Sequence, residues 1–182
     1  MSVDLRLVAA RVAGGDVAAF RPIVDHTRVP LYRLAARLVG NLADAEDALQ
    51  DAYASAFRAL SEGRYDGRAK IETWLYRIVT NACVDLLRKR RERPAEETGE
   101  PRFDGLVRAE ARVALNELDA MLKALQPQDR AALVLVTVEG LSAKEAAEAL
   151  GCSEGALEQR LVRARAALRT KTEAGEVSDG HA

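Results

Sequence analysis

The residues with the strongest chemical character in this sequence are five cations within six positions, Arg88, Lys89, Arg90, Arg91 and Arg93. Cations at the end of a helix interact favourably with its negative C-terminus, which would be a purely structural role. Five cations exceed what a helix dipole needs, and such a cluster attracts phosphate groups. We therefore expect this segment, the basic run, to bind a polyanion.

A second basic segment follows a short turn near the end of the chain. Ser142 and Glu145 have the spacing of a capping box, and Gly151–Ser153 separates that predicted helix from the next. Two helices joined by a short turn that contains glycine are typical of a helix-turn-helix. A helical hairpin with a solvated basic face is the alternative. Capping, turn and charge together favour DNA binding by the second helix, which carries Arg160, Arg163, Arg165, Arg169 and Lys171.

An aromatic residue among cations lies in a glycine-containing loop, residues 61–70. Tyr65 is flanked there by Arg64, Arg68 and Lys70. Side chains of these types stack and clamp single-stranded nucleic acid. A tyrosine that covers a hydrophobic seam is the alternative.

An acidic face precedes this loop, on the helix predicted for Asp44–Leu60. Asp44, Asp47, Gln50 and Asp51 fall on its outward or flanking sides. Acids in a first turn favour the positive helix N-terminus, but Asp51 lies too deep in the helix to owe much to that effect. An acidic ridge in this position suits a basic partner.

Several kinds of chemistry have no support in the sequence. Two cysteines, Cys83 and Cys152, and two histidines, His26 and His181, form neither a disulfide framework nor a metal-ligand pattern. A nucleotide-binding glycine loop and a nucleophile motif are also lacking. We therefore expect no cofactor, no metal and no enzymatic activity. Without a signal core or an apolar run of membrane-spanning length, we expect a cytoplasmic protein with no membrane insertion.

Helices must position all of these residues. The composition, 48% hydrophobic and 30% charged with a net charge of −1, is that of an ordered helical protein. The polar stretch PAEETGEP, residues 94–101, reads as a linker. The sequence predicts an all-α fold of two small helical domains, residues 1–93 and 106–172, joined by a flexible linker over 94–105 and followed by a disordered tail over 173–182.

Apolar residues at helical spacing define the elements within these domains. The longest amphipathic helix covers residues 71–93 and organises the first half of the chain. Pro30 should kink or split the helix predicted over 16–39. Further helices are predicted over residues 4–12, 44–60, 106–125, 127–139, 142–150 and 154–171.

Three blocks of sequence together resemble a bacterial RNA polymerase sigma factor of the extracytoplasmic-function (ECF, group IV) subfamily of the sigma-70 family. They are DAEDALQDAYASAFRAL, ETWLYRIVTNACVDLLRKRRE and LSAKEAAEALGCSEGALEQRLVRARAAL. Their order and spacing match the family over almost the whole chain, which makes the resemblance specific.

The resemblance implies a region 2-like domain that binds the clamp helices of the largest polymerase subunit and melts the −10 element. It implies a region 4-like domain that contacts the polymerase flap and reads duplex DNA at −35. By position, the resemblance assigns polymerase binding to Asp47, Gln50, Asp51 and Phe57. It assigns single-stranded −10 DNA to Tyr65, Arg68, Lys70, Asn81, Arg88, Lys89, Arg90 and Arg91, and the −35 element to Lys144, Glu158, Gln159, Arg160, Arg163 and Arg165.

The recognition helix departs from the family pattern. The family commonly has Thr-Val-Arg/Lys-Ser-Arg where this chain has Ala-Leu-Glu-Gln-Arg, residues 156–160. A glutamate at Glu158 can accept from a cytosine amino group, and Gln159 can pair with adenine. No −35 sequence is therefore transferred from the family.

The resemblance also implies control by an anti-sigma factor. Two alternatives to a sigma factor remain. The first is a helix-turn-helix regulator that binds duplex DNA without polymerase, and the second is a sigma-like module that binds only proteins.

Overall fold

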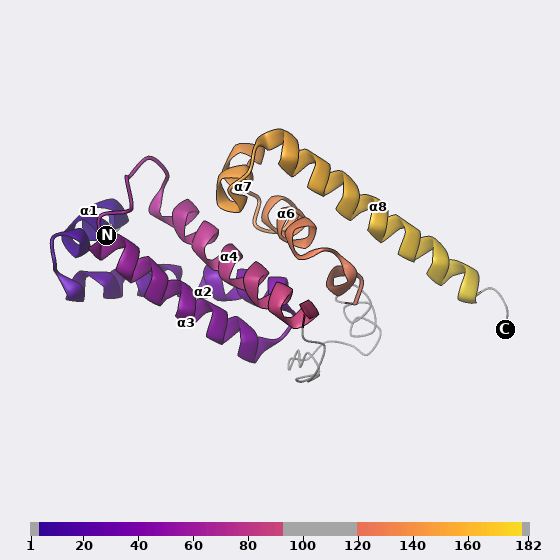
Figure 1. Cartoon of the computed structure of the whole chain (residues 1–182), viewed down its shortest axis with the longest axis horizontal. Coiled ribbons are helices and arrows are strands. Elements are labelled where there is room, and N and C mark those ends of the chain that lie inside the picture. Colours follow the sequence, from indigo (N-terminus) through magenta and orange to yellow (C-terminus); the bar gives the residue numbers. More distant parts are fainter. Residues whose placement is uncertain (1–3, 93–119, 180–182) are drawn as a thin grey trace.

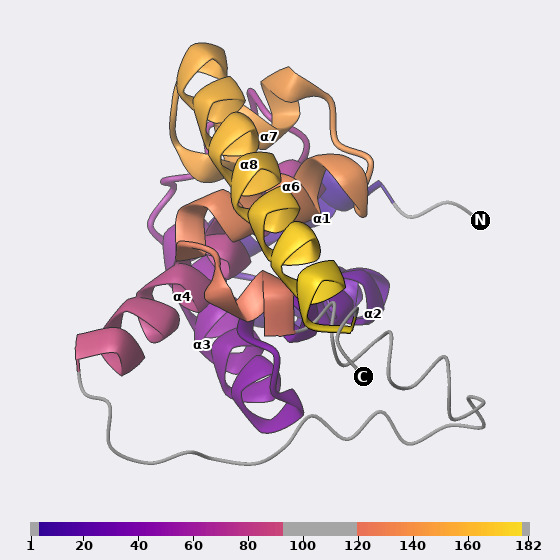
Figure 2. The ribbon, with the colours of Figure 1, turned by 90° about the vertical axis from the view of Figure 1, so that its right-hand side faces the viewer.

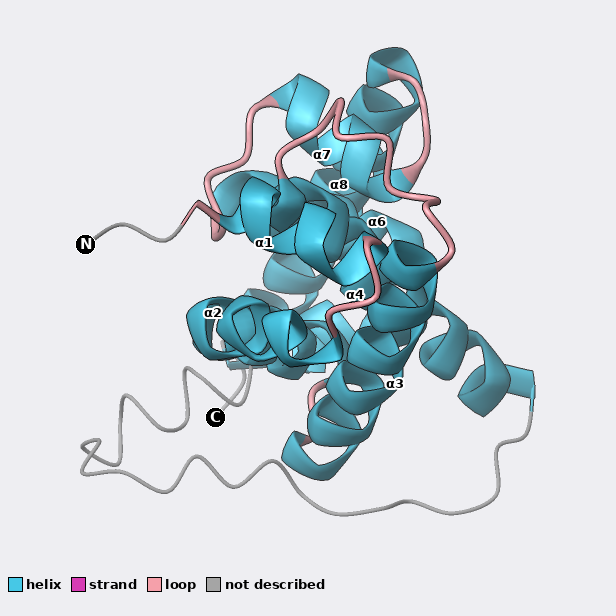
Figure 3. Cartoon of the chain, turned by 90° about the vertical axis from the view of Figure 1, so that its left-hand side faces the viewer, coloured by secondary structure: helices cyan, strands magenta, loops and turns pink. Residues whose placement is uncertain are grey.

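The computed structural model describes residues 4–92 and 120–179 of the chain, and this part contains helices and loops with no strand (Figure 3). Two helical domains are present, as the sequence predicted. Within the described residues, no helix has both the length and the apolar character needed to cross a membrane. The predicted linker, residues 94–105, lies outside the described residues, as does most of the helix predicted over 106–125.

The N-terminal domain, residues 4–92, is built from helices whose ends follow local side-chain chemistry. The Asp4 carboxylate accepts hydrogen bonds from the backbone N–H groups of Arg6 and Leu7, and Asn41 caps another helix in the same way. Gly40 ends the preceding helix in a left-handed conformation with φ of 71°. The elements are α1 (Leu5–Ala13), a 3-10 turn (Val17–Ala19), α2 (Phe20–Val39), α3 (Leu42–Ser61) and α4 (Ile71–Glu92).

Helix α4 occupies the centre of the fold, as expected, and contacts α2 and α3 as well as helices of the second domain (Figure 1). Its buried stripe repeats every four residues, at Ile71, Leu75, Val79 and Cys83. This stripe packs inward and leaves the opposite face of α4 to solvent. Cys83 is a packed core residue, and burial raises the pKa of its thiol to about 12.

Pro30 neither splits nor ends α2, contrary to one of the expected outcomes. The helix continues through it to Val39. Pro30 and His26, whose carbonyl loses its usual N–H partner, both lie on the exposed side of α2. Water can hydrate that carbonyl, so the missing hydrogen bond does not break the helix.

The C-terminal domain, residues 120–179, contains α6 (Pro127–Thr137), α7 (Ala143–Leu150) and α8 (Glu154–Asp179). Helix α8 continues beyond Lys171 to Asp179, so the tail expected to be disordered is helical over residues 173–179. Gly175 is the sole strong helix-weakening residue there, and no proline interrupts the helix. Figure 2 shows α8 lying across α6.

Helix α6 is buried on almost every side because it is packed between two sets of helices. It contacts α7 and α8 of its own domain and α2 and α4 of the N-terminal domain. Pro127 and all residues of 129–135 are buried. One continuous apolar core therefore includes residues of both domains. The sequence predicted the two domains but not their packing against each other.

Candidate nucleic-acid interface

The exposed face of α4 carries the residues expected at the melted strand. Arg77, Asn81 and Asp85 recur every four residues and are all exposed. The structure gives the Asn81 amide no hydrogen bond within the described part of the chain. Its carbonyl and its N–H groups are therefore both available to an unpaired base edge.

The loop before α4 divides the predicted residues into two kinds. The Tyr65 hydroxyl donates to the carbonyl of Ala69 at 2.6 Å, and the Tyr65 ring lies 5.1 Å from that of Trp74. Burial raises the pKa of Tyr65, which keeps the phenol neutral. One face of this ring thus covers an apolar seam, as the structural alternative proposed. Arg68 and Lys70 remain exposed, with Arg68 3.4 Å from Asp66.

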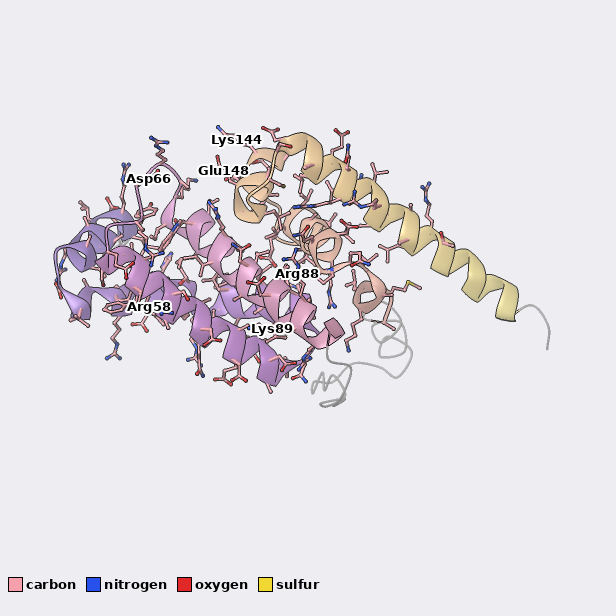
Figure 4. The ribbon with its side chains drawn as sticks, in the orientation of Figure 1. Arg58, Asp66, Arg88, Lys89, Lys144 and Glu148 are labelled. Atoms are coloured by element: carbon pink, nitrogen blue, oxygen red, sulfur yellow. The ribbon has the colours of Figure 1, made fainter. Side chains whose placement is uncertain are left out.

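The basic run is divided in a similar way. Arg88 and Lys89 are exposed and project from the last turns of α4 (Figure 4). Arg90 instead forms an ion pair with Asp44, whose side chain is 15% exposed, and so joins the end of α4 to the start of α3. Asp44 therefore belongs to an internal contact rather than to the free acidic face. The side chains of Arg91 and Arg93 lie outside what the structure describes.

The acidic ridge on α3, which we define as Asp47, Gln50 and Asp51, is exposed as expected. Its position opposite the buried alanines of α3 leaves it free of core packing. Phe57 differs from the ridge, because its half-buried ring packs edge-on against Phe20 with 5.3 Å between ring centroids. Phe57 therefore anchors α3 to α2 while the ridge faces solvent.

The helix-turn-helix has the local geometry that its sequence predicted. Ser142 Oγ accepts from the backbone N–H of Glu145 at 3.3 Å, and the Glu145 carboxylate accepts from the N–H of Ser142 at 3.0 Å. Gly151 adopts φ of 59° in the turn. Ser153 Oγ accepts from the N–H of Ala156 and caps α8. These contacts fix the angle at which α8 leaves the turn.

The residues expected at −35 are not equivalent in the structure. Lys144, Glu158, Gln159 and Arg165 are exposed. Arg160 is half-buried, and its Nη1 atom is covered. These positions place Glu158, Gln159 and Arg165 on the accessible side of α8 and turn Arg160 towards its packed side.

Arg163 forms a two-point contact with Asp129 of α6. Its Nη2 and Nε atoms donate to the two carboxylate oxygens at 2.8 and 3.1 Å. The Asp129 side chain is only 8% exposed, and its hydrogen bonds raise the pKa of Arg163. Arg163 therefore has a structural partner that the sequence analysis did not foresee.

This contact leads to a prediction. We expect Arg163→Ala to lower the unfolding temperature of the chain, because it leaves a buried carboxylate without its cation. Arg165→Ala, the matched control two residues away, should leave the unfolding temperature unchanged. It should instead reduce the salt slope of DNA binding by about one unit, as expected for one lost phosphate contact. If Arg163→Ala instead lowered the salt slope and left the unfolding temperature unchanged, Arg163 would be assigned to phosphate binding.

Sequence reasoning missed four residues between the domains: Arg37, Tyr76, Arg130 and Glu139. The nearest signal was the run AALVLVTV, residues 131–138, which is apolar on all sides of a helix. Such a helix is buried all round rather than on one face. Within the described residues, no three His, Cys, Asp or Glu side chains cluster so as to hold a metal ion.

Comparison with known families gives matches to both halves of the chain. Residues 23–93 match Sigma-70 region 2 and residues 115–168 match Sigma-70 region 4. The first match contains the acidic ridge, the loop and α4. The second contains the helix-turn-helix.

Similar proteins extend over both domains. The ECF RNA polymerase sigma factor SigM of Mycobacterium tuberculosis (strain H37Rv) is 40% identical over 91% of this chain and 82% of its own length. The ECF sigma factor SigW of Bacillus subtilis is 33% identical over 93% of this chain and 97% of its own. Among solved structures, CnrH in complex with the cytosolic domain of CnrY superposes with a TM-score of 0.66 and 31% identity, covering 93% of this chain and 97% of CnrH.

Proposed function

The chain belongs to the ECF subfamily of sigma-70 RNA polymerase sigma factors. We propose that separate surfaces of the chain bind the polymerase, the −10 strand and the −35 duplex. Such a factor binds core RNA polymerase and directs transcription initiation. It does so without covalent chemistry of its own, by adding sequence specificity and strand-separating contacts to the polymerase. We propose that this chain has no enzymatic activity and acts in the cytoplasm with the polymerase.

The observation that carries the proposal is the exposure of two separate recognition surfaces on one domain. The acidic ridge of α3 is free to bind the basic clamp helices of the polymerase. The face of α4 that carries Asn81, with Arg68, Lys70, Arg88 and Lys89 around it, is free to hold the −10 single strand. Tyr65 supports that strand-binding loop through its contacts with Trp74 and Ala69.

At −35, we propose that α8 enters the major groove with Glu158 and Gln159 as base readers. Lys144 and Arg165 supply phosphate contacts, Arg163 holds α8 to α6 through Asp129, and the half-buried Arg160 lies towards the packed side of α8. An anti-sigma factor is proposed as a further partner, since CnrH, a solved relative, forms a complex with CnrY.

In vitro transcription tests the proposal. Core polymerase with this chain should initiate at specific sites on a genomic library, and core polymerase alone should not. A gel shift of the same promoters, with and without core polymerase, separates this function from that of a polymerase-independent regulator. Specific duplex binding that is unaffected by polymerase, together with no initiation, would reject the proposal.

The recognition helix allows a sharper prediction. Glu158→Arg should change which −35 sequence is preferred, by roughly 1–3 kcal/mol at one base pair, because an acceptor for cytosine is replaced by a donor pair for guanine. Competition among −35 variants at two salt concentrations measures this change. If the substitution tightens binding to every sequence equally, Glu158 is not a base reader but a surface acid that weakens binding to DNA in general.

A further inference from the structure

A cation from the first helix of the chain lies on the strand-binding loop, residues 61–70. It is Arg6 of α1, and this helix precedes the segment that matches Sigma-70 region 2, residues 23–93. Nothing in the sequence connects α1 with DNA, because α1 and the loop are distant from each other along the chain. Figure 1 shows α1 beside the loop, on the side away from α7.

A glycine of the loop lies directly under the Arg6 side chain. A Cβ built at Gly67 would lie 3.3 Å from Arg6 Nη2, 3.5 Å from Nε and 3.7 Å from Cζ. Three atoms of one planar group at such similar distances mean that a face of the guanidinium covers the glycine. Gly67 also has a φ of +71°, which residues with a side chain rarely adopt. The loop therefore presents bare backbone to Arg6.

Arg6 differs from the arginines of the loop itself in its charge partners. Arg64 pairs with Glu62 at 2.6 Å. Arg68 lies 3.4 Å from Asp66. Arg6 is exposed, and its guanidinium forms no ion pair and donates no hydrogen bond to any residue that the structure describes. The N–H donors at the edge of this group are therefore available to an external acceptor.

Arg6 and the loop line a pocket in which positive charge exceeds negative charge. Three cations line it, Arg6, Arg68 and Lys70, together with two acids, Asp4 and Glu72. The Asp4 carboxylate is engaged in capping α1, where it accepts from two backbone N–H groups. The open side of the pocket therefore attracts an anion.

A backbone phosphate of single-stranded DNA is the anion that suits this position. Guanidinium groups bind phosphate through two donors at once, and a group whose face rests on Gly67 keeps its edge free for that contact. The loop leads into α4, whose exposed face carries Arg77 and Asn81. A strand that passes Asn81 towards the N-terminal end of α4 next meets the loop and then Arg6.

We infer that Arg6 is a further DNA-binding residue, which holds one backbone phosphate of the −10 single strand against the strand-binding loop. This inference rests on the proposed function. The guanidinium contacts the loop with its face and the strand with its edge, so a single side chain orders both. Helix α1 thereby becomes part of the −10 site.

Arg6→Gln in the full chain, assembled with core polymerase, tests this contact. The probe is a labelled single strand with the −10 sequence of the strongest promoter from the transcription experiment. We expect its affinity to fall roughly fivefold, because one charged hydrogen-bonding contact is lost. The salt slope should fall by about 0.7, the value for one phosphate of a single strand. Arg6→Lys keeps the charge and should keep the slope.

Arg11→Gln is the matched control, because it removes the same charge from the same helix. Arg11 pairs with Asp16 at 2.6 Å and does not line the pocket. The control should bind the strand with wild-type affinity and salt slope. Trp74, the single tryptophan of the chain, packs against Tyr65 of the loop. Its emission in the free chain should be the same in all variants, which shows that the loop keeps its structure.

Neutral methylphosphonate groups, placed at one phosphate of the strand at a time, identify the partner of Arg6. At one position the neutral group should weaken binding by the wild type, Arg6→Lys and Arg11→Gln. It should not weaken binding by Arg6→Gln, in which that contact is already lost. A disturbed loop would instead change the effects at several phosphates, so this comparison separates a direct contact from a structural one.

Two results would overturn the inference. The first is that every methylphosphonate has the same effect on Arg6→Gln as on the wild type. The second is equal weakening by Arg6→Gln and Arg6→Lys with an unchanged salt slope, since Arg6 would then support the loop without touching DNA. If the wild-type holoenzyme binds the −10 strand no better than a strand of scrambled sequence, the proposed function fails, and this inference fails with it.

Discussion

A chain with Asp47, Gln50 and Asp51 all replaced by alanine is expected to lose its affinity for core RNA polymerase, by on the order of 100-fold or more. The three side chains form the exposed ridge of α3 and face away from the core. Their removal therefore takes away the proposed contacts with the basic clamp helices. Fluorescence anisotropy with labelled chain and core polymerase measures the loss.

The fold should remain intact in this triple variant. Circular dichroism and the unfolding temperature should match those of the wild type, because exposed acids contribute little to stability. A control that replaces Asp25 and Glu62, exposed acids of the same domain, should keep its polymerase affinity. Holoenzyme formation by the ridge variant at wild-type strength would remove polymerase binding from this surface.

Asn81→Ala should reduce open-complex formation on duplex promoters by roughly tenfold or more, while templates already mismatched at −10 are affected much less. Extruding a base costs a few kcal/mol, and the hydrogen bonds of the Asn81 amide would help to offset that cost. Because Asn81 is exposed, its loss should not disturb the fold. Permanganate footprinting of unpaired thymines on the two templates measures the difference.

The mismatched template serves as the internal control for this prediction. It needs no strand separation, so a defect confined to the duplex assigns Asn81 to melting. Equal defects on both templates would instead mean that Asn81 positions other parts of α4. Unaltered circular dichroism is required in either case.

Local rules predicted much of the fold. The apolar spacing of residues 71–92 located α4, and the chemistry of Ser142, Glu145 and Gly151 located the turn between α7 and α8. These elements are set by residues within a few positions of one another. The outward position of the acidic ridge followed from the same periodicity.

These local rules could not predict contacts between segments that are distant in the sequence. Charge alone placed Arg90 and Arg163 among the candidates for phosphate contacts, yet their partners are Asp44, which lies 46 positions away, and Asp129, which lies 34 positions away. Nothing in the spacing of cations distinguishes a guanidinium group that pairs internally from one that remains free. The same reason hid the polar contacts between the domains, which are made by Arg37 of α2, Tyr76 of α4 and Arg130 of α6 and by Glu139 in the turn after α6.

The burial of α6 bears on how sigma factors of this kind can be recombined. A chimera that keeps this C-terminal domain and takes its N-terminal domain from a relative replaces α2 and α4, the helices against which α6 packs. The contact of Arg130 is made to a backbone carbonyl, which any partner sequence supplies, whereas the pair of Arg37 and Glu139 needs both side chains. Exchanged domains would thus dock in the native orientation with half of the polar contacts, unless the two ends of that pair are transplanted together.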